Sequence, residues 1–262
     1  MIDIEDGSEF DEALVISCFP SEGFVSSIVA HFLVDKLGLE LVGGIRHSGL
    51  PPVCLVQEGS PLPPIRLYSG VPICNVDKCD KVVLIASEIQ ISPNLKLPIA
   101  SEILDWMSES GAGISIMIDS YAHGEGQKHS IFDEDKSPDT VVGIGSNEKS
   151  REMLKEIGAT LLKQGVVGGM TGVMLGESRR RKMDSLAVIA ESGGEFSGGG
   201  IPDARAAARI IECLDGLLPA VKLDPEPLFE EAQRIEGKIR VMMALHVNSE
   251  SDVVSAPSTM YG

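Results

Sequence analysis

The sequence is short of basic residues and has no long uninterrupted apolar run. It holds 22 lysines and arginines against 39 aspartates and glutamates, which gives a formal net charge of −17. Such a charge repels phosphate backbones and anionic membranes, so it disfavours nucleic acid as a partner. No apolar run reaches membrane-spanning length, and the amino terminus lacks the basic and apolar regions of a signal peptide. We therefore expect neither membrane insertion nor export.

Cysteine also shows no pattern of pairing or metal binding. The five cysteines are an odd number, and the gap between Cys74 and Cys79 matches no common zinc or redox spacing. Such a set is typical of reduced thiols, most of them buried. The sequence thus predicts a cytoplasmic protein with no metal centre and no cofactor.

What the sequence does contain is an alternation of apolar strands and helices. The segment from Glu12 to Phe19 is continuously apolar, as expected for a strand buried on both faces. After a break at Pro20, apolar residues recur at helical spacing up to Leu37. Further strands are predicted at Lys81 to Ser87, Gly113 to Asp119, Thr140 to Ile144 and Asp184 to Ala190, with helices around 99–107, 153–161 and 206–214. This predicts an α/β fold, a three-layer α/β/α sandwich with a mostly parallel sheet.

Three regions depart from this alternation. Residues 39–75 hold short β-like pieces broken by prolines, which predict hairpin-like extensions or edge strands, because proline cannot donate to a central ladder. Residues 225–247 predict a last helix whose apolar stripe packs on the body or on another subunit. Residues 248–262 are small and polar and predict a flexible tail. We interpret residues 1–247 as a single domain.

The best case for enzymatic chemistry lies after the strand that ends at Asp119. The following loop carries His123 and His129 among carboxylates, and open parallel sheets place ligands beyond the carboxyl ends of their strands. The two histidines have no defined ligand spacing, so a solvated acidic loop is the simpler interpretation. Gly168 belongs to a glycine cluster that could cradle a phosphate, but no P-loop ending follows, and a tight turn before a helix is the favoured interpretation.

Other clusters have similar structural interpretations. The basic run Arg179 to Lys182 fits a helix end, where cations complement free carbonyls, and the alternative is a docking patch for an acidic partner. The glycine-rich stretch Ser192 to Gly200 predicts a surface loop. Asp203, shortly after it, is the predicted first residue of a helix. No serine or cysteine stands in a Gly-x-Ser-x-Gly frame, so no catalytic residue is predicted.

Several stretches occur in a recognisable order from about Asp11 to Leu245. They are Gly23-Phe24-Val25, Leu41 to Gly44, Pro51-Pro52, Gly59 to Pro63, Val82 to Ile85, Gly165 to Gly172, and Ile201 to Leu214. In this order they resemble the proteasome assembly chaperone family, in its archaeal and bacterial branch. One departure is Ser26, where many members repeat a glycine. The resemblance implies a three-layer fold similar to nucleoside phosphorylases, homo-oligomers, and a role in building or binding the 20S core particle without chemistry.

With that resemblance, the last three residues become informative. Met260-Tyr261-Gly262 matches the hydrophobic–tyrosine–any-residue ending by which proteasome activators insert into pockets between α-ring subunits. Met260 would fill a groove, Tyr261 would combine burial with a hydrogen bond, and the Gly262 carboxylate would pair with a basic residue. A single short tail binds weakly, so several tails on a homo-oligomer are expected. The alternative is an idle disordered tail.

Three functions stay open at this point. The first is a non-catalytic assembly chaperone or regulator that docks its tail on the 20S α-ring. The second is an enzyme of nucleoside phosphorylase or hydrolase type that uses the loops around Asp119, His123 and Gly168. The third is an oligomeric scaffold for an unrelated partner.

Overall fold

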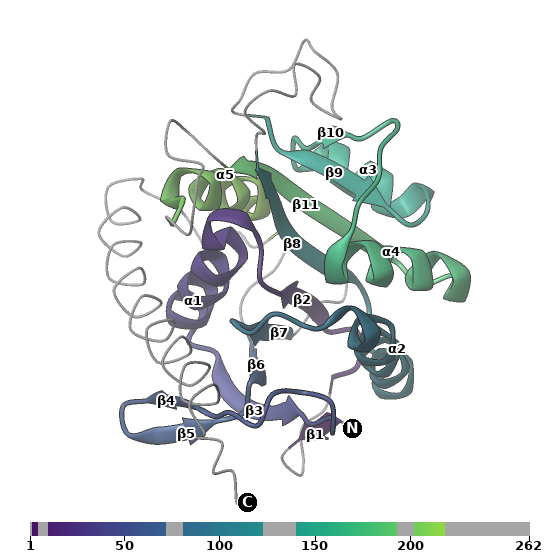
Figure 1. Ribbon diagram of the computed structural model, residues 1–262. Helices are drawn as coiled ribbons and strands as arrows, with labels where there is room; N and C mark the ends of the chain where they lie inside the picture. Colours follow the sequence, from purple (N-terminus) through teal and green to yellow (C-terminus); the bar gives the residue numbers. More distant parts are fainter. Residues whose placement is uncertain (1, 5–9, 72–80, 123–139, 193–201, 218–262) are drawn as a thin grey trace, which may run out of the picture.

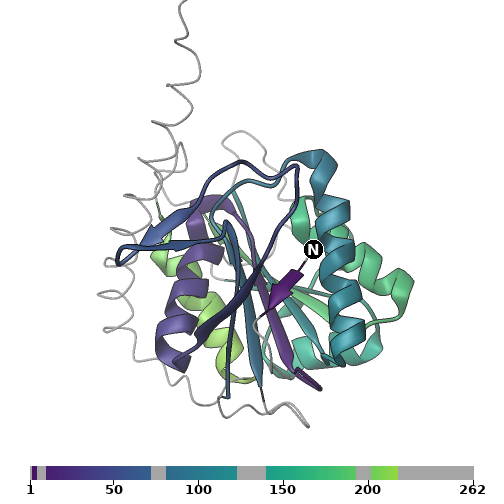
Figure 2. The ribbon, with the colours of Figure 1, turned by 90° about the horizontal axis from the view of Figure 1, so that it is seen from below.

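A computed structural model describes residues 2–4, 10–71, 81–122, 140–192 and 202–217 (Figure 1). Within these residues, a nine-stranded sheet is covered by helices on both faces. Figure 2 shows the sheet between α1 on one side and α2 on the other. The predicted three-layer α/β architecture is therefore confirmed. The predicted last helix and tail, residues 225–262, lie outside the described residues.

The sheet has a parallel centre and antiparallel flanks. Across the sheet, its strands are β1 (Ile2–Ile4), β3 (Glu40–Ile45), β6 (Ile65–Gly70), β7 (Val82–Ser87), β2 (Leu14–Cys18), β8 (Ser115–Ala122), β11 (Ser185–Ser192), β9 (Val142–Gly145) and β10 (Thr160–Leu161). The four neighbours β7, β2, β8 and β11 run parallel to one another. Antiparallel pairing with β6 on one side and with β9 on the other turns the sheet into a mixed one.

The central strands are continuous apolar runs because both of their faces are buried. Every residue of β2 and of β7 is buried. Successive side chains of β2 point to opposite faces, so that Leu14 and Ile16 pack in one core and Val15 in the other. The prediction of a first strand buried on both faces is thus confirmed.

The helices divide between the two faces of the sheet. They are α1 (Val25–Leu37), α2 (Pro93–Ser110), α3 (Glu148–Glu156), α4 (Gly169–Arg181) and α5 (Ala204–Asp215), with a short 3₁₀ turn η1 (Glu22–Phe24) before α1. One core packs residues of α1 and α5 against the sheet, and the other packs residues of α2 and α4. No helix in these described ranges is long and apolar enough to cross a bilayer.

The proline-rich region only partly follows its prediction. Strands β4 (Leu55–Gln57) and β5 (Ser60–Leu62) form a separate two-stranded hairpin, as expected for a hairpin-like extension. The edge-strand expectation is wrong for β6, which lies inside the main sheet between β3 and β7. Pro63 and Pro64 precede the strand, so they remove no hydrogen bond from its ladder.

A second difference concerns the helix predicted around residues 153–161. Helix α3 ends at Glu156, and Thr160 and Leu161 form the edge strand β10 instead. Gly158 adopts a left-handed backbone with φ of 78°, which stops the helix and turns the chain back to the sheet. The apolar residues after Glu156 therefore face the core from a turn and a strand.

Candidate functional site

A cavity of about 540 Å³ opens beyond the carboxyl ends of β2 and β8. After β2 the chain continues through α1 to β3, on one side of β2, whereas after β8 it continues to β9, on the other side. The connections that leave these two neighbouring strands go in opposite directions, so the crevice between β2 and β8 is the topological switch point of the sheet. Open α/β sheets bind ligands in such a crevice. The cavity, which we call the switch-point cavity, is therefore the first candidate site.

The wall of the switch-point cavity that follows β2 is an unusual turn. Gly23 and Phe24 both have left-handed backbones, with φ of 58° and 53°. A Cβ at Gly23 would collide with the side chain of Ser192. The carbonyl oxygen of Gly23 accepts a hydrogen bond from the backbone N–H of Asp203 at 2.8 Å. The glycine is thus required where α5 begins against the turn. Phe24 has no such freedom, so its backbone is strained at the rim of the cavity.

Asp119 is the polar centre of the switch-point cavity. Its carboxylate accepts the backbone N–H of Ser120 at 2.8 Å. Burial raises the pKa of this carboxyl above its usual range and the negative charge of Glu22 adds to the rise, against hydrogen bonds from the Thr171 side chain and the Ser120 backbone. Two carboxylates, Asp119 and Glu22, therefore share this cavity.

The opposite wall is the start of α4. Gly168 precedes the helix and Gly169 has φ of 68°, so the predicted tight turn is present. A Cβ at Gly172 would overlap the carbonyl oxygen of Val167, which requires glycine there as well. The structure thus brings Asp119 and Gly168 into one cavity, whereas His123 and His129 lie outside the described residues.

Sequence reasoning missed a buried ionic cluster formed by α1, β6 and the end of β7. Arg66 is 1% exposed, and its Nη2 donates to both carboxylate oxygens of Glu88, at 2.7 Å to Oε2. His31 Nε2 lies 3.0 Å from Glu88 Oε1, and Arg66 Nε donates to the Tyr68 hydroxyl at 2.9 Å. Burial alone would raise the pKa of Glu88, but the hydrogen bond to His31 and the charge and hydrogen bonds of Arg66 lower it to about 2. The one sequence signal for this cluster was Arg66 itself, a charged residue within the predicted strand from Ile65 to Tyr68.

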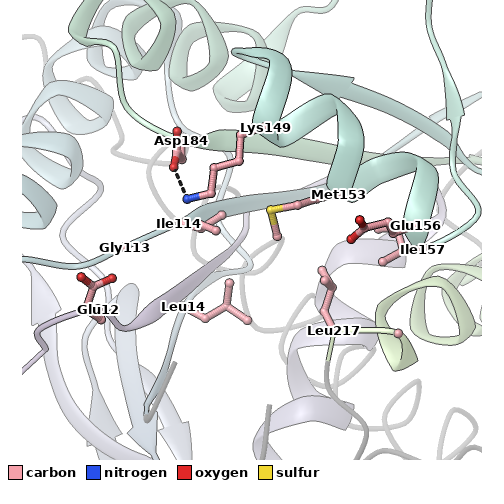
Figure 3. A pocket seen from close by; sticks show the side chains of 11 residues that line it. Glu12, Leu14, Gly113, Ile114, Lys149, Met153, Glu156, Ile157, Asp184 and Leu217 are labelled. Atoms are coloured by element: carbon pink, nitrogen blue, oxygen red, sulfur yellow. Dashed lines mark hydrogen bonds and ion pairs between the residues drawn. The ribbon is translucent and has the colours of Figure 1, made fainter. Parts of the chain in front are cut away.

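A second cavity, of about 490 Å³, lies at the opposite end of the sheet, beside the amino ends of β2, β8 and β11. Its centre is apolar, with Leu14 and Met153 between Glu12 and Glu156 (Figure 3). On its rim Lys149 Nζ lies 2.7 Å from Asp184 Oδ2. This arrangement offers an apolar surface with a polar rim.

The basic run behaves as a helix end. Arg179 donates to the Ser146 carbonyl at 2.8 Å, Arg180 pairs with Glu177 at 2.6 Å, and Arg181 pairs with Asp105 at 2.6 Å. The carboxylates of Glu177 and Asp105 offset the charges of Arg180 and Arg181, which disfavours the docking-patch alternative.

The predicted helix start at Asp203 is confirmed, since its carboxylate accepts the backbone N–H of Ala206 at 2.9 Å. The glycine-rich stretch before it falls almost entirely outside the described residues. Within the part of the chain that the structure describes, no group of three or more histidines, cysteines or carboxylates is placed to hold a metal ion. The tail residues Met260, Tyr261 and Gly262 also lie outside it.

Comparisons with known proteins place these features in a family. A sequence model of the PAC2 family matches residues 15–243. The chain is 28% identical over 243 residues to an uncharacterized protein of Methanocaldococcus jannaschii, which covers 93% of this chain and 90% of that protein. PbaA of Pyrococcus furiosus, an archaeal homolog of proteasome-assembly chaperone, is similar in structure with a TM-score of 0.72 at 29% identity, over 95% of this chain and 100% of that chain. PbaB of the same organism, an archaeal proteasome activator, shares the fold with a TM-score of 0.68 at 19% identity, over 92% and 97%.

Proposed function

Since the chain belongs to the PAC2 family, we propose that it is a non-catalytic proteasome-binding assembly chaperone or regulator of the cytoplasm. The observation that carries this proposal is the similarity to PbaA, a homolog of proteasome-assembly chaperone, over almost the full length of both chains. Similarity of fold alone does not identify a function, because proteins with one fold have many different activities. Near-complete coverage at 29% identity is the stronger argument, since it includes the loops as well as the strands.

The contact with the proteasome is proposed to be the carboxy-terminal tail. Met260-Tyr261-Gly262 has the apolar, aromatic and carboxylate groups that a pocket between α-ring subunits of the 20S particle would bind. The polar residues from 248 onward give the motif a tether of about a dozen residues. Such a tether lets a tail reach a pocket without fixing the orientation of the α/β body.

Self-association belongs to the same proposal. One short tail buries too little surface for a stable complex, whereas several tails on one oligomer raise the effective concentration of each. The apolar stripe predicted in residues 225–247 is a surface through which copies would associate. The number of docked tails then sets the avidity for the ring.

The test is native mass spectrometry of the full chain mixed with its cognate 20S particle. We expect a complex that contains several copies of the chain, and we expect it to be lost when Met260 to Gly262 are deleted or when Tyr261 is changed to alanine. A Ser258→Ala variant, which alters the tether and leaves the motif intact, is the matched control. Undiminished binding by the deletion variant would refute docking by the tail, and absence of any complex with the full chain would refute the proteasome as partner.

A further inference from the structure

We propose that the switch-point cavity binds a protonated alkylamine, held by the carboxylates of Asp119 and Glu22. This goes beyond proteasome binding, because it assigns a ligand to the body of the protein rather than to its tail. The same chemical group can come from a free amine or from a lysine side chain of a partner protein.

The charge in the cavity selects a cation. Asp119 and Glu22 both line it, and among the described lining residues none is lysine, arginine or histidine. Burial is the main cause of the raised pKa of Asp119, repulsion from the negative charge of Glu22 adds to the rise, and the positive charge of Lys96 opposes it. An ammonium group between the two carboxylates would relieve this repulsion. It has only hydrogen-bond donors, and the two carboxylates have only acceptors, so the groups are complementary. An anion would meet the same two carboxylates and is disfavoured, even though the start of α4 forms part of the wall.

The rest of the lining suits the methylene chain of an alkylamine. Phe19, Phe24 and Tyr121 place aromatic rings in the wall, and Met170 and Ile189 add aliphatic surface. Aromatic faces attract ammonium groups and also cover methylene groups. A volume of about 540 Å³ lies within the range of small-ligand sites.

Two further observations concern the rim of the cavity. Phe24 keeps a left-handed backbone, which is unfavourable for an aromatic residue, and strain of this kind concentrates at ligand sites. Val166, on the opposite wall, is 85% exposed although it is apolar. A ligand with an apolar stem would cover this side chain as its ammonium reaches the carboxylates.

Isothermal titration calorimetry of the full chain tests the proposal with two probes. The probes are spermidine and a capped tripeptide with one central lysine, and the control is the same peptide with norleucine in place of lysine. We expect saturable binding of at least one probe. Binding should weaken about tenfold or more in Asp119→Asn and several-fold in Glu22→Gln, because each change removes a charge-assisted hydrogen bond. Glu156→Gln, which makes the same change in the second cavity, should bind like the wild type.

The outcomes separate the sources and the alternatives. Binding of spermidine alone identifies a free amine as the ligand, and binding of the lysine peptide alone identifies a side chain of a partner. The proposal is overturned if neither probe saturates, if the norleucine peptide binds as well as the lysine peptide, or if affinity is unchanged in Glu22→Gln. Glu22 is exposed, so its variant is expected to fold and decides the matter even if Asp119→Asn does not fold.

Discussion

Changing Glu88 to glutamine removes the negative charge that pairs with the buried Arg66. The glutamine keeps the size of the side chain and one acceptor oxygen, but it leaves the guanidinium of Arg66 without a countercharge. Because Arg66 is 1% exposed, water cannot take the place of that countercharge. The variant therefore isolates the contribution of the carboxylate's charge to stability.

The magnitude follows from the pKa of Glu88, which falls from 4.5 to about 2 in the folded protein. This difference corresponds to about 3 kcal/mol of stability at neutral pH. The folded-state pKa is below the unfolded value, so the stabilisation is complete well above pH 4.5 and is lost as the pH falls from 4.5 towards 2. We expect the free energy of unfolding of Glu88→Gln to be lower than that of the wild type by about 3 kcal/mol at pH 7.

The assay is urea unfolding of both proteins at pH 7, 5 and 3.5, followed by circular dichroism. The difference between wild type and variant should persist at pH 5 and shrink at pH 3.5, because at pH 3.5 wild-type Glu88 is already mostly protonated in the unfolded state and still mostly ionised in the folded state. Glu212→Gln, on the exposed face of α5, is the matched control and should change stability by less than about 0.5 kcal/mol. A difference that stays the same from pH 7 to pH 3.5 would show that shape rather than charge is responsible, and the reasoning would be wrong.

Two further predictions concern helix geometry. Gly172→Ala should destabilise the fold by about 1–3 kcal/mol, because its Cβ would overlap the carbonyl of Val167, whereas Gly176→Ala on the same helix meets open space and should stabilise by about 0.5–1 kcal/mol; chemical denaturation of the two variants measures the contrast. Asn147 caps α3 by accepting the backbone N–H of Ser150 at 2.9 Å, so Asn147→Ala should cost about 1 kcal/mol, and an unchanged melting temperature would contradict this.

Local patterns predicted the centre of this fold well. Strands β2, β7, β8 and β11 are continuous apolar segments because both faces are buried, and that composition is visible along the chain. The direction and neighbours of β6 were not predictable in the same way. Its pairing with β3 and β7 depends on partners distant in the sequence, and the flanking prolines suggested an edge.

The residues of the candidate site were also only partly predictable from the sequence. Asp119 was identified because ligands bind beyond the carboxyl ends of parallel strands, and Gly168 because it belongs to a glycine cluster before a helix. Glu22 and Phe24 were not identified as site residues, since their role depends on a left-handed turn that only the structure shows. The Arg66–Glu88 cluster was missed because its members come from three elements whose proximity no local spacing encodes.

The order of strands in the sheet also has a consequence for synthesis of the chain. The parallel centre joins β2, near the amino terminus, to β8, and β8 in turn to β11, which ends at Ser192. Pairings between such distant segments close long loops, and folding rates fall as the average sequence separation of contacts rises. On a ribosome, β2 must wait for about a hundred further residues before β8 can pair with it. The apolar strand β2 is therefore one of the first segments made, while its partners β7 and β8 follow much later, and in the interval its unpaired edges are exposed to aggregation.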